Sequence, residues 1–285
     1  MQTFVIDETQ ARSRADVFVA AQFPSYPRTA LVKLFESEHI LLNDKPVKPG
    51  YKVREGDVFT VDTSPLIVTI PEIDLPIIYE DDQVIVVDKP SGVISHARGR
   101  YFDEPSVASF VRQKVAAMTG ERAGIVHRLD RATSGVMICA KTPDAMSFLQ
   151  KQFSQHNNKK TYLAIVAGIV DPSEALIDVP LARNPAKPQT FMPDRAGKEA
   201  QTHYTVLKSN DKYSLLELHP VTGRSHQLRV HLKHIGHPIV GDILYGGAEA
   251  SRLMLHALSL EITLPGGERR TFTAPTPPEF KELMA

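Results

Sequence analysis

The chain has 285 residues, 42% of them hydrophobic and 23% charged, which is typical of a soluble globular protein with one large domain or a large and a small one. Its 33 basic and 33 acidic residues give a formal net charge of zero, which excludes a uniformly basic surface. The single cysteine, Cys139, excludes an internal disulfide, and no apolar run approaches the roughly 20 residues that span a bilayer. These features predict a cytoplasmic protein with no membrane-spanning segment.

Residues 1–62 are predicted to form a small separate module of helices and strands. Helices are expected at 14–22 and 28–38, since Pro27 suits a helix start, where its missing N–H costs nothing. Strands should follow at 40–42 and 58–61, with turns at Asn43-Asp44-Lys45 and before Val58. The candidates for contacts with a phosphate backbone are basic, although a solvated face explains scattered lysines equally well: Arg28, Lys33, Lys45 and Lys48.

A linker is expected at 63–76, where three prolines occur and no helical period is present. The remaining residues, 77–285, should form one larger domain. Strands are predicted within 77–89 and at 136–140, 162–170, 203–207, 213–218 and 253–262, and helices at 105–118 (with Gly120 beyond its end), 145–153 and 224–235. Because strands dominate and adjoin, the domain is predicted to be α+β, with a largely antiparallel mixed sheet covered by helices.

Two stretches of the larger domain are locally basic. Residues 112–160 contain nine lysines and arginines and three acidic residues. Residues 218–241 contain three lysines and arginines, five histidines and no acidic residue. A locally positive cleft on a neutral protein can bind phosphate backbones.

The most informative segment is HRLDRATSG at 127–135, just ahead of an apolar strand. Asp130 lies between Arg128 and Arg131 in the sequence, and adjacent guanidinium groups favour an ionised carboxylate. An ionised carboxylate suits a nucleophile or a proton acceptor rather than a general acid. The alternative is a structural ion pair that ties down a loop.

Two more motifs lie in the basic stretches. Lys159 and Lys160 precede Tyr162 at a strand start, where a tyrosine most often packs at the rim and two lysines attract phosphate. The segment 223–232, GRSHQLRVHL, opens a helix whose apolar face should dock on the core, so that Arg229 is held rigidly while it projects outward. Metal binding is the rival interpretation of this segment, because four histidines cluster in it: His226, His231, His234 and His237. Against that interpretation, no cysteine accompanies them and their spacings match no zinc pattern.

The three motifs together resemble the RluA-type RNA pseudouridine synthases. HRLDRATSG is similar to the catalytic signature of that family, and the Lys159–Tyr162 and 223–232 segments are similar to its second and third motifs. The string GHPIVGD at 236–242 also resembles the family and is interpreted as a structural turn. The resemblance covers roughly residues 77–265, and residues 11–62 resemble the ribosomal S-four-type RNA-binding domain.

The resemblance implies a role for each matched residue. Asp130 would be the catalytic carboxylate, Arg229 would pair with it, and Tyr162 would stack on the uracil and help remove a proton. Arg128 would contact the flipped nucleotide or occupy its vacated place, and Leu255 would lie beneath the uracil. The enzyme would need no cofactor and no metal, and it would act as a monomer.

The implied substrate is ribosomal large-subunit RNA, with transfer RNA as the second choice. Two other classes remain open. One is a non-catalytic RNA-binding or assembly protein with the same fold. The other is a hydrolase that cleaves a glycosidic bond with two carboxylates, for which the sequence offers Asp130 no convincing partner.

Overall fold

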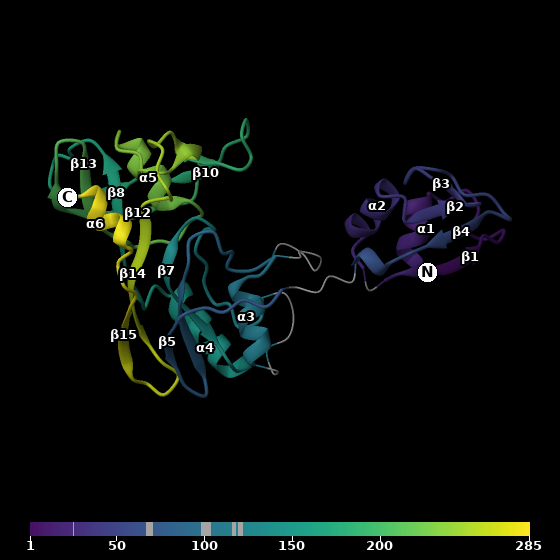
Figure 1. Cartoon of the computed structure of the whole chain (residues 1–285), viewed down its shortest axis with the longest axis horizontal. Helices are drawn as coiled ribbons and strands as arrows, with labels where there is room; N and C mark the ends of the chain where they lie inside the picture. Colours follow the sequence, from purple (N-terminus) through teal and green to yellow (C-terminus); the bar gives the residue numbers. More distant parts are fainter. Residues whose placement is uncertain (25, 67–70, 98–103, 116–117, 119–121) are drawn as a thin grey trace. The chain divides into compact units, whose positions relative to one another are not determined.

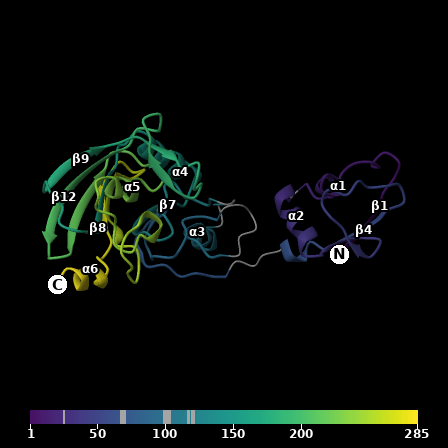
Figure 2. The same cartoon turned by 90° about the horizontal axis from the view of Figure 1, so that it is seen from above.

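The computed structural model describes residues 1–24, 26–66, 71–97, 104–115, 118 and 122–285. These residues form two compact units, one containing the described residues up to 71 and the other those from 72 onward. Figure 1 labels the elements of both units, and Figure 2 shows them from above. Within the described residues, no helix is long and apolar enough to span a membrane.

The N-terminal unit is a four-stranded antiparallel sheet covered by two helices. Its strands lie in the order β1-β4-β2-β3, and α1 and α2 contribute Phe18 and Leu31 to a core that also contains Phe59. The predicted helices and the predicted strand pair are confirmed, whereas β1 and β3 were not expected because most of their side chains are exposed. The elements are β1 (Gln2–Val5), α1 (Ala15–Gln22), α2 (Arg28–Glu36), β2 (Ile40–Leu42), β3 (Lys45–Pro46) and β4 (Val58–Val61).

The second unit is a large mixed sheet with packed helices, which confirms the predicted α+β class. Its nine strands run in the order β5-β6-β7-β14-β8-β13-β12-β9, with β15 on β14, and β10 pairs with β11 apart from them. The elements are β5 (Ile77–Glu80), β6 (Val84–Lys89), α3 (Val107–Lys114), β7 (Ser134–Ala140), α4 (Pro143–Ser154), β8 (Lys159–Ala167), β9 (Glu174–Asp178), β10 (Leu181–Arg183), β11 (Phe191–Pro193), β12 (Gln201–Ser209), β13 (Tyr213–Pro220), α5 (Gln227–His234), β14 (Leu255–Thr263), β15 (Arg269–Thr273) and α6 (Pro278–Leu283).

Strand direction in this sheet decides which loops meet at one edge. Every pairing among the described strands of the sheet is antiparallel except that of β14 with β7, where His256 lies opposite Ser134 and Ala257 opposite Gly135. Because parallel neighbours begin at the same edge, the loop before β7 and the first residues of β14 come together. Gly135 has φ of 115°, and a side chain there would collide with the carbonyl oxygen of Ala257.

Strands β6 and β7 are buried on both faces, which explains their continuous apolar sequences. Ile85 and Met137 point to the face covered by α3, which contributes Phe110. Val86 and Ile138 point to the opposite face, which is covered by α4. Figure 2 shows β7 between the two helices. Covered faces of this kind remove the alternation of polar and apolar residues that a half-exposed strand shows.

Several predicted elements differ from the observed ones. The helix expected at 105–118 spans only Val107–Lys114, because Val115 is extended, and Gly120 lies outside the described residues. The helix expected at 224–235 begins at Gln227, since His226 has φ of 56° and ends the preceding turn. Strands β9, β10, β11 and β15 were not predicted. They are short and mostly half-exposed, so their hydrophobic pattern is weak.

The segment predicted as a linker has an apolar anchor near each end. Leu66 is buried in the core of the N-terminal unit, and Leu75 is buried in the core beneath α3. The domain bounds of 1–62 and 77–285 stay predictions.

Lys89, at the end of β6, is fully buried and holds two loops together. Its ammonium group donates to the carbonyl oxygens of Pro90 at 2.8 Å, Val93 at 2.7 Å and Arg131 at 3.2 Å. Burial lowers the pKa of Lys89 to about 7, and the negative charge of Asp130 opposes that shift. Lys89 therefore fixes the backbone of the residue that follows Asp130.

We predict that Lys89→Met lowers the free energy of unfolding by about 2–4 kcal/mol, because the methionine leaves buried carbonyl oxygens without a donor. Urea unfolding followed by circular dichroism measures the change. Lys187→Met, at an exposed position, is the matched control and should change the unfolding free energy by less than about 0.5 kcal/mol. Equal stability of the two variants would contradict the structural role of Lys89.

Candidate active site

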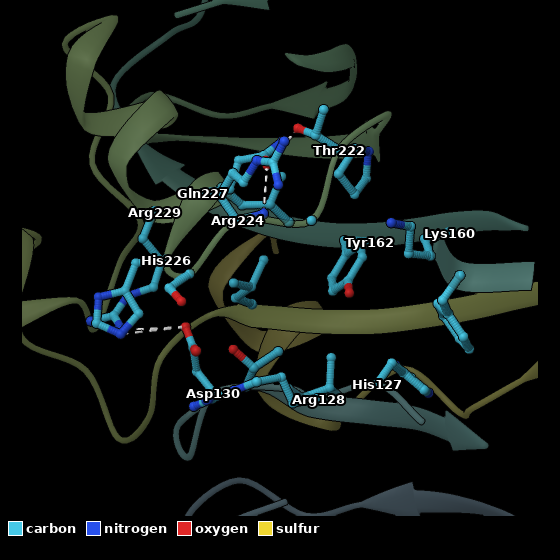
Figure 3. Close-up of a pocket in the computed structure, with 18 of the residues that line it drawn as sticks. His127, Arg128, Asp130, Lys160, Tyr162, Thr222, Arg224, His226, Gln227 and Arg229 are labelled. Atoms are coloured by element: carbon cyan, nitrogen blue, oxygen red, sulfur yellow. Dashed lines mark hydrogen bonds and ion pairs between the residues drawn. The ribbon is translucent and has the colours of Figure 1, made fainter. Parts of the chain in front are cut away.

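A cavity of about 410 Å³ lies where the loop before β7, the start of β8 and the start of α5 meet. In the view of Figure 3, Asp130 and His226 lie toward one end, Lys160 toward the other, and Tyr162 between them. The residues that line the cavity come from five segments: His127, Arg128, Leu129, Asp130 and Thr133; Phe153, Ser154 and His156; Lys160 and Tyr162; Pro220, Thr222, Gly223, Arg224, Ser225, His226, Gln227, Leu228 and Arg229; and Leu255.

The backbone around Asp130 is held by hydrogen bonds on both sides. The Ser95 hydroxyl donates to the carbonyl oxygen of Leu129 and accepts from its N–H, while Lys89 donates to the carbonyl oxygen of Arg131. The Asp130 carbonyl oxygen accepts from the N–H of Thr133 at 3.1 Å. The carboxylate of Asp130 therefore projects into the cavity from a loop with little freedom to move.

His127 secures the beginning of the same loop. Its Nε2 accepts from the N–H of Ile138 at 3.1 Å, and its ring stacks on Phe153 with centroids 4.5 Å apart. Burial lowers the pKa of His127 to about 3, so the ring is neutral and free to act as an acceptor.

The charge partner of Asp130 is distant in sequence. Oδ2 of Asp130 lies 3.5 Å from Nη1 of Arg229 and 3.8 Å from Nε2 of His226, and the Asp130 side chain is 19% exposed. The contact with Arg229 is the one that the motif resemblance implied, whereas neither arginine adjacent in sequence pairs with Asp130. Arg131 points away and pairs with Glu104 through two contacts, and Arg128 is exposed and forms no ion pair with the described residues.

Arg229 is anchored by a second carboxylate. Its Nε and Nη2 donate to the two oxygens of Asp242, both at 2.7 Å, so that Nη1 remains to face Asp130. The Arg229 guanidinium also lies over the ring of Tyr245, 4.9 Å from its centroid. The prediction that Arg229 projects outward from the helix is therefore wrong, because its side chain points into the protein and is only 9% exposed.

Asp242 was missed by the sequence analysis, which took its segment as a turn. The turn is real, since Gly241 has φ of 82° and a side chain there would collide with the carbonyl oxygen of Arg252. One signal was present: Asp242 is the first acid after a basic stretch that contains none. A buried arginine on the preceding helix needs such a partner, because an unpaired buried charge is costly.

The other predicted substrate contacts line the same cavity. Tyr162 and Leu255 lie on the adjacent strands β8 and β14, and Leu255 is buried. Burial and the negative charge of Asp130 both raise the pKa of Tyr162, so the phenol holds its proton.

The two predicted lysines of β8 differ in their surroundings. Lys160 lines the cavity with no ion-pair partner among the described residues, and burial lowers its pKa. Lys159 lies outside the lining and is 3.6 Å from the carboxylate of Glu261. Lys160 is therefore the better placed of the two to meet a phosphate group.

The basic residues predicted to bind RNA in the N-terminal unit fall into two kinds. Arg28 is half-exposed, and together with Arg14 it neutralises the buried carboxylate of Asp16, with an Arg28–Asp16 distance of 2.6 Å. The other three are exposed and form no ion pair with described residues: Lys33, Lys45 and Lys48.

The described residues do not support the two rival kinds of site. They contain no group of three or more histidine, cysteine or acidic residues arranged to hold a metal ion. His231 instead bonds to the Thr202 hydroxyl and the Val179 carbonyl oxygen. Asp130 is the single carboxylate in the described lining of the cavity, whereas glycosidic hydrolysis by a carboxylate pair requires two.

Comparison with known proteins places the chain among RNA-modifying proteins. Residues 83–234 match the family described as RNA pseudouridylate synthase, and residues 13–59 match the S4 domain. An uncharacterized RNA pseudouridine synthase of Aquifex aeolicus is 38% identical over 247 residues, covering 84% of this chain and 78% of that protein. A ribosomal large subunit pseudouridine synthase D of Xanthomonas campestris is 34% identical, covering 99% and 91%.

A solved structure has the same fold over most of the chain. The human RNA pseudouridylate synthase domain containing 1 aligns with a TM-score of 0.60 and 28% identity, over 71% of this chain and 83% of that one.

We predict that Asp242→Asn lowers the free energy of unfolding by about 3–5 kcal/mol, because it leaves the charge of Arg229 buried without its bidentate partner. A double-mutant cycle with Arg229→Met measures the coupling, and the double variant should be more stable than the sum of the two single losses implies. Additive losses would show that the two side chains do not depend on each other.

Proposed function

The chain belongs to the RNA pseudouridylate synthase family, and from that premise we propose that it isomerises uridines of ribosomal large-subunit RNA with Asp130 as the catalytic carboxylate. It is a pseudouridine synthase, an isomerase that breaks the glycosidic bond of a uridine, turns the uracil and rejoins the sugar to a ring carbon. Nothing is added or removed overall, so the reaction itself requires no cofactor.

The observation that carries the proposal is the position of the Asp130 carboxylate. It enters the cavity from a backbone fixed by Ser95 and Lys89, and its Oδ2 faces the guanidinium of Arg229 at 3.5 Å. An arginine whose other nitrogens are already bonded to Asp242 cannot follow the carboxylate if it moves. Asp130 is thus held beside a fixed cation and oriented toward the space that a nucleotide would fill.

Two routes stay open for Asp130, which are direct attack on the sugar or ring and removal of a sugar proton. In both routes the carboxylate loses its negative charge. That charge is one of the two causes of the raised pKa of Tyr162, the other being burial. Tyr162 is proposed to stack on the uracil and, because its phenol holds a proton, to help remove the proton from the ring carbon as a relay that passes its own hydroxyl proton to water as it accepts the new one.

A uridine stacked in RNA cannot reach this cavity, so we infer that the nucleotide is flipped out, at a cost of a few kcal/mol. Leu255 would support the uracil from below, and Lys160 would attract a neighbouring phosphate. Arg128, exposed at the rim, would contact the flipped nucleotide or fill the space it leaves.

The choice of ribosomal RNA follows the relatives named ribosomal large subunit pseudouridine synthase D, and transfer RNA is the second choice. The S4-type unit would add affinity through backbone contacts, which position RNA but do not read its sequence. We propose that the enzyme works in the cytoplasm as a monomer.

We predict that Asp130→Asn abolishes pseudouridine formation while RNA binding is retained, because the amide is neither a nucleophile nor a proton acceptor of comparable strength. Both proteins are incubated with total RNA from cells that lack the enzyme, and pseudouridines are mapped by chemical adduct and reverse-transcriptase stops. Asp211→Asn, at an exposed turn, is the matched control and should restore the same stops as the wild type.

The position of the restored stops identifies the substrate. Stops in large-subunit RNA support the proposal, and stops confined to transfer RNA contradict its substrate. If neither the wild type nor Asp130→Asn modifies RNA that both bind, the enzymatic proposal fails in favour of a binding protein. Release of free uracil would favour the hydrolase.

We predict that Lys45→Gln with Lys48→Gln weakens RNA binding and reduces the slope of log affinity against log salt by about 1–2, because two phosphate contacts are lost. The single-turnover rate at saturating enzyme should stay the same, since the catalytic cavity is unchanged. Glu8→Gln with Glu55→Gln, at exposed positions, controls for the loss of surface charges. A large fall in the rate with binding unchanged would count against this role.

A further inference from the structure

His226 lies beside Asp130 in an unusual backbone conformation. It is the residue before α5, with φ of 56° and ψ of 17°, in the left-handed region that a residue with a side chain rarely adopts. This conformation places the imidazole against the cavity, with Nε2 3.8 Å from Oδ2 of Asp130. Backbone strain of this kind gathers at functional sites, where the surrounding structure holds it in place.

Two aromatic rings fix the plane of the imidazole. Phe191 of β11 and Tyr245 both pack edge-on against it, with ring centroids 5.5 Å and 5.6 Å away. The Tyr245 hydroxyl is also 2.8 Å from Nδ1 of His226. The ring is thus held from the side opposite Asp130.

The hydrogen bonds of Tyr245 favour the tautomer of His226 that carries its proton on Nε2. The hydroxyl accepts from the N–H of Phe191 at 2.9 Å, and its own hydrogen has one acceptor among the described residues, Nδ1 of His226. A hydroxyl has one hydrogen to donate, and a neutral imidazole has one N–H. If Nδ1 accepts, the imidazole proton is on Nε2, which faces Asp130.

We propose that His226 is a positioning residue of the pseudouridine synthase reaction: its neutral Nε2–H tautomer, set by Tyr245, directs an N–H at Oδ2 of Asp130 and leaves Oδ1 for the nucleotide. The inference rests on the proposed role of Asp130.

The neutral form of His226 matters because of the charges that surround it. Asp130 and Asp242 favour a protonated imidazole, whereas Arg229 and Arg128 disfavour it. Burial has the largest effect, and the pKa of His226 lies below its ordinary value. A second cation beside Arg229 would stabilise the carboxylate further and make it a weaker nucleophile or base, so protonation of His226 should slow the reaction.

The distance of 3.8 Å is longer than a hydrogen bond, so in this structure the Nε2–H only faces Asp130. Catalytic hydrogen bonds of this kind often shorten when substrate binds. Movement of the Asp130 carboxylate by about 0.6 Å or more toward the imidazole would bring the two atoms within hydrogen-bond distance.

The first test reads the tautomer without using activity. Long-range proton–nitrogen NMR spectra of the full chain, with ¹⁵N-labelled histidine, distinguish a protonated from an unprotonated ring nitrogen, and His226→Gln assigns the signals. We expect Nδ1 unprotonated and Nε2 protonated at neutral pH, and a mixture of tautomers in Tyr245→Phe. A proton on Nδ1 in the wild type, or unchanged signals in Tyr245→Phe, would overturn the inference.

The second test is the pH dependence of the single-turnover rate on the RNA that the wild type modifies. His226→Ala should lower the rate about 10–100-fold with little change in RNA affinity. His226→Gln keeps an N–H donor that cannot gain a proton, so it should stay within about tenfold of the wild type. In the wild type, the rate should fall at low pH as His226 becomes protonated. In His226→Gln this fall should be absent, because glutamine does not gain a proton.

Controls separate the two proposals. His203→Gln, on an exposed position of β12, should leave both the rate and its pH profile unchanged. If the wild type is active but His226→Ala and His226→Gln lose equal activity with identical pH profiles, the residue is merely structural and the inference fails. If Asp130→Asn is as active as the wild type, the proposed role of Asp130 fails, and the inference about His226 fails with it.

Discussion

The bidentate ion pair of Arg229 with Asp242 is the interaction on which the site depends. It buries the Arg229 guanidinium and leaves one of its nitrogens pointing at Asp130. The positive charge that faces the Asp130 carboxylate is therefore fixed in position. A lysine would supply the same charge, but it lacks the planar guanidinium with which Arg229 directs separate N–H donors at two carboxylates. The fold supplies the rest by bringing the first turn of α5, which lines the cavity, into contact with Asp242 in the turn that follows the helix.

The sheet explains how one loop can be both exposed to substrate and rigid. Strands β6 and β7 are covered on both faces, so the segments between and beside them are attached to the most buried part of the unit. Lys89 uses that position to bond three carbonyl oxygens, and Ser95 satisfies both backbone groups of Leu129. The loop therefore has buried polar partners instead of the water that usually surrounds a loop.

The sequence predicted the fold class, most helices and long strands, and several of the residues that line the cavity, because these follow local patterns and motif resemblance. Motif resemblance predicted that Arg229 approaches Asp130, but the sequence did not predict the other side-chain pairs of the site. Arg131 lies next to Asp130 in sequence and pairs elsewhere, while Asp242 and Tyr245 support the site from a turn with no periodic signal. Contacts between distant segments depend on strand order, and a single sequence contains no direct record of that order. Short edge strands such as β9 were not predicted either, because few of their side chains are buried and their hydrophobic pattern is weak.

Because β7 pairs with β14, the cavity can be completed only after the C-terminal part of the chain has been synthesised. The Ser134 hydroxyl and His256, 122 residues apart in the chain, bond to each other where the two strands meet. During synthesis the segment with Asp130 leaves the ribosome long before β14 does, so the wall that includes Leu255 is still missing. Contacts of such long range form late in folding. A nascent chain therefore exposes the segment with Asp130 before the cavity that surrounds this carboxylate is complete.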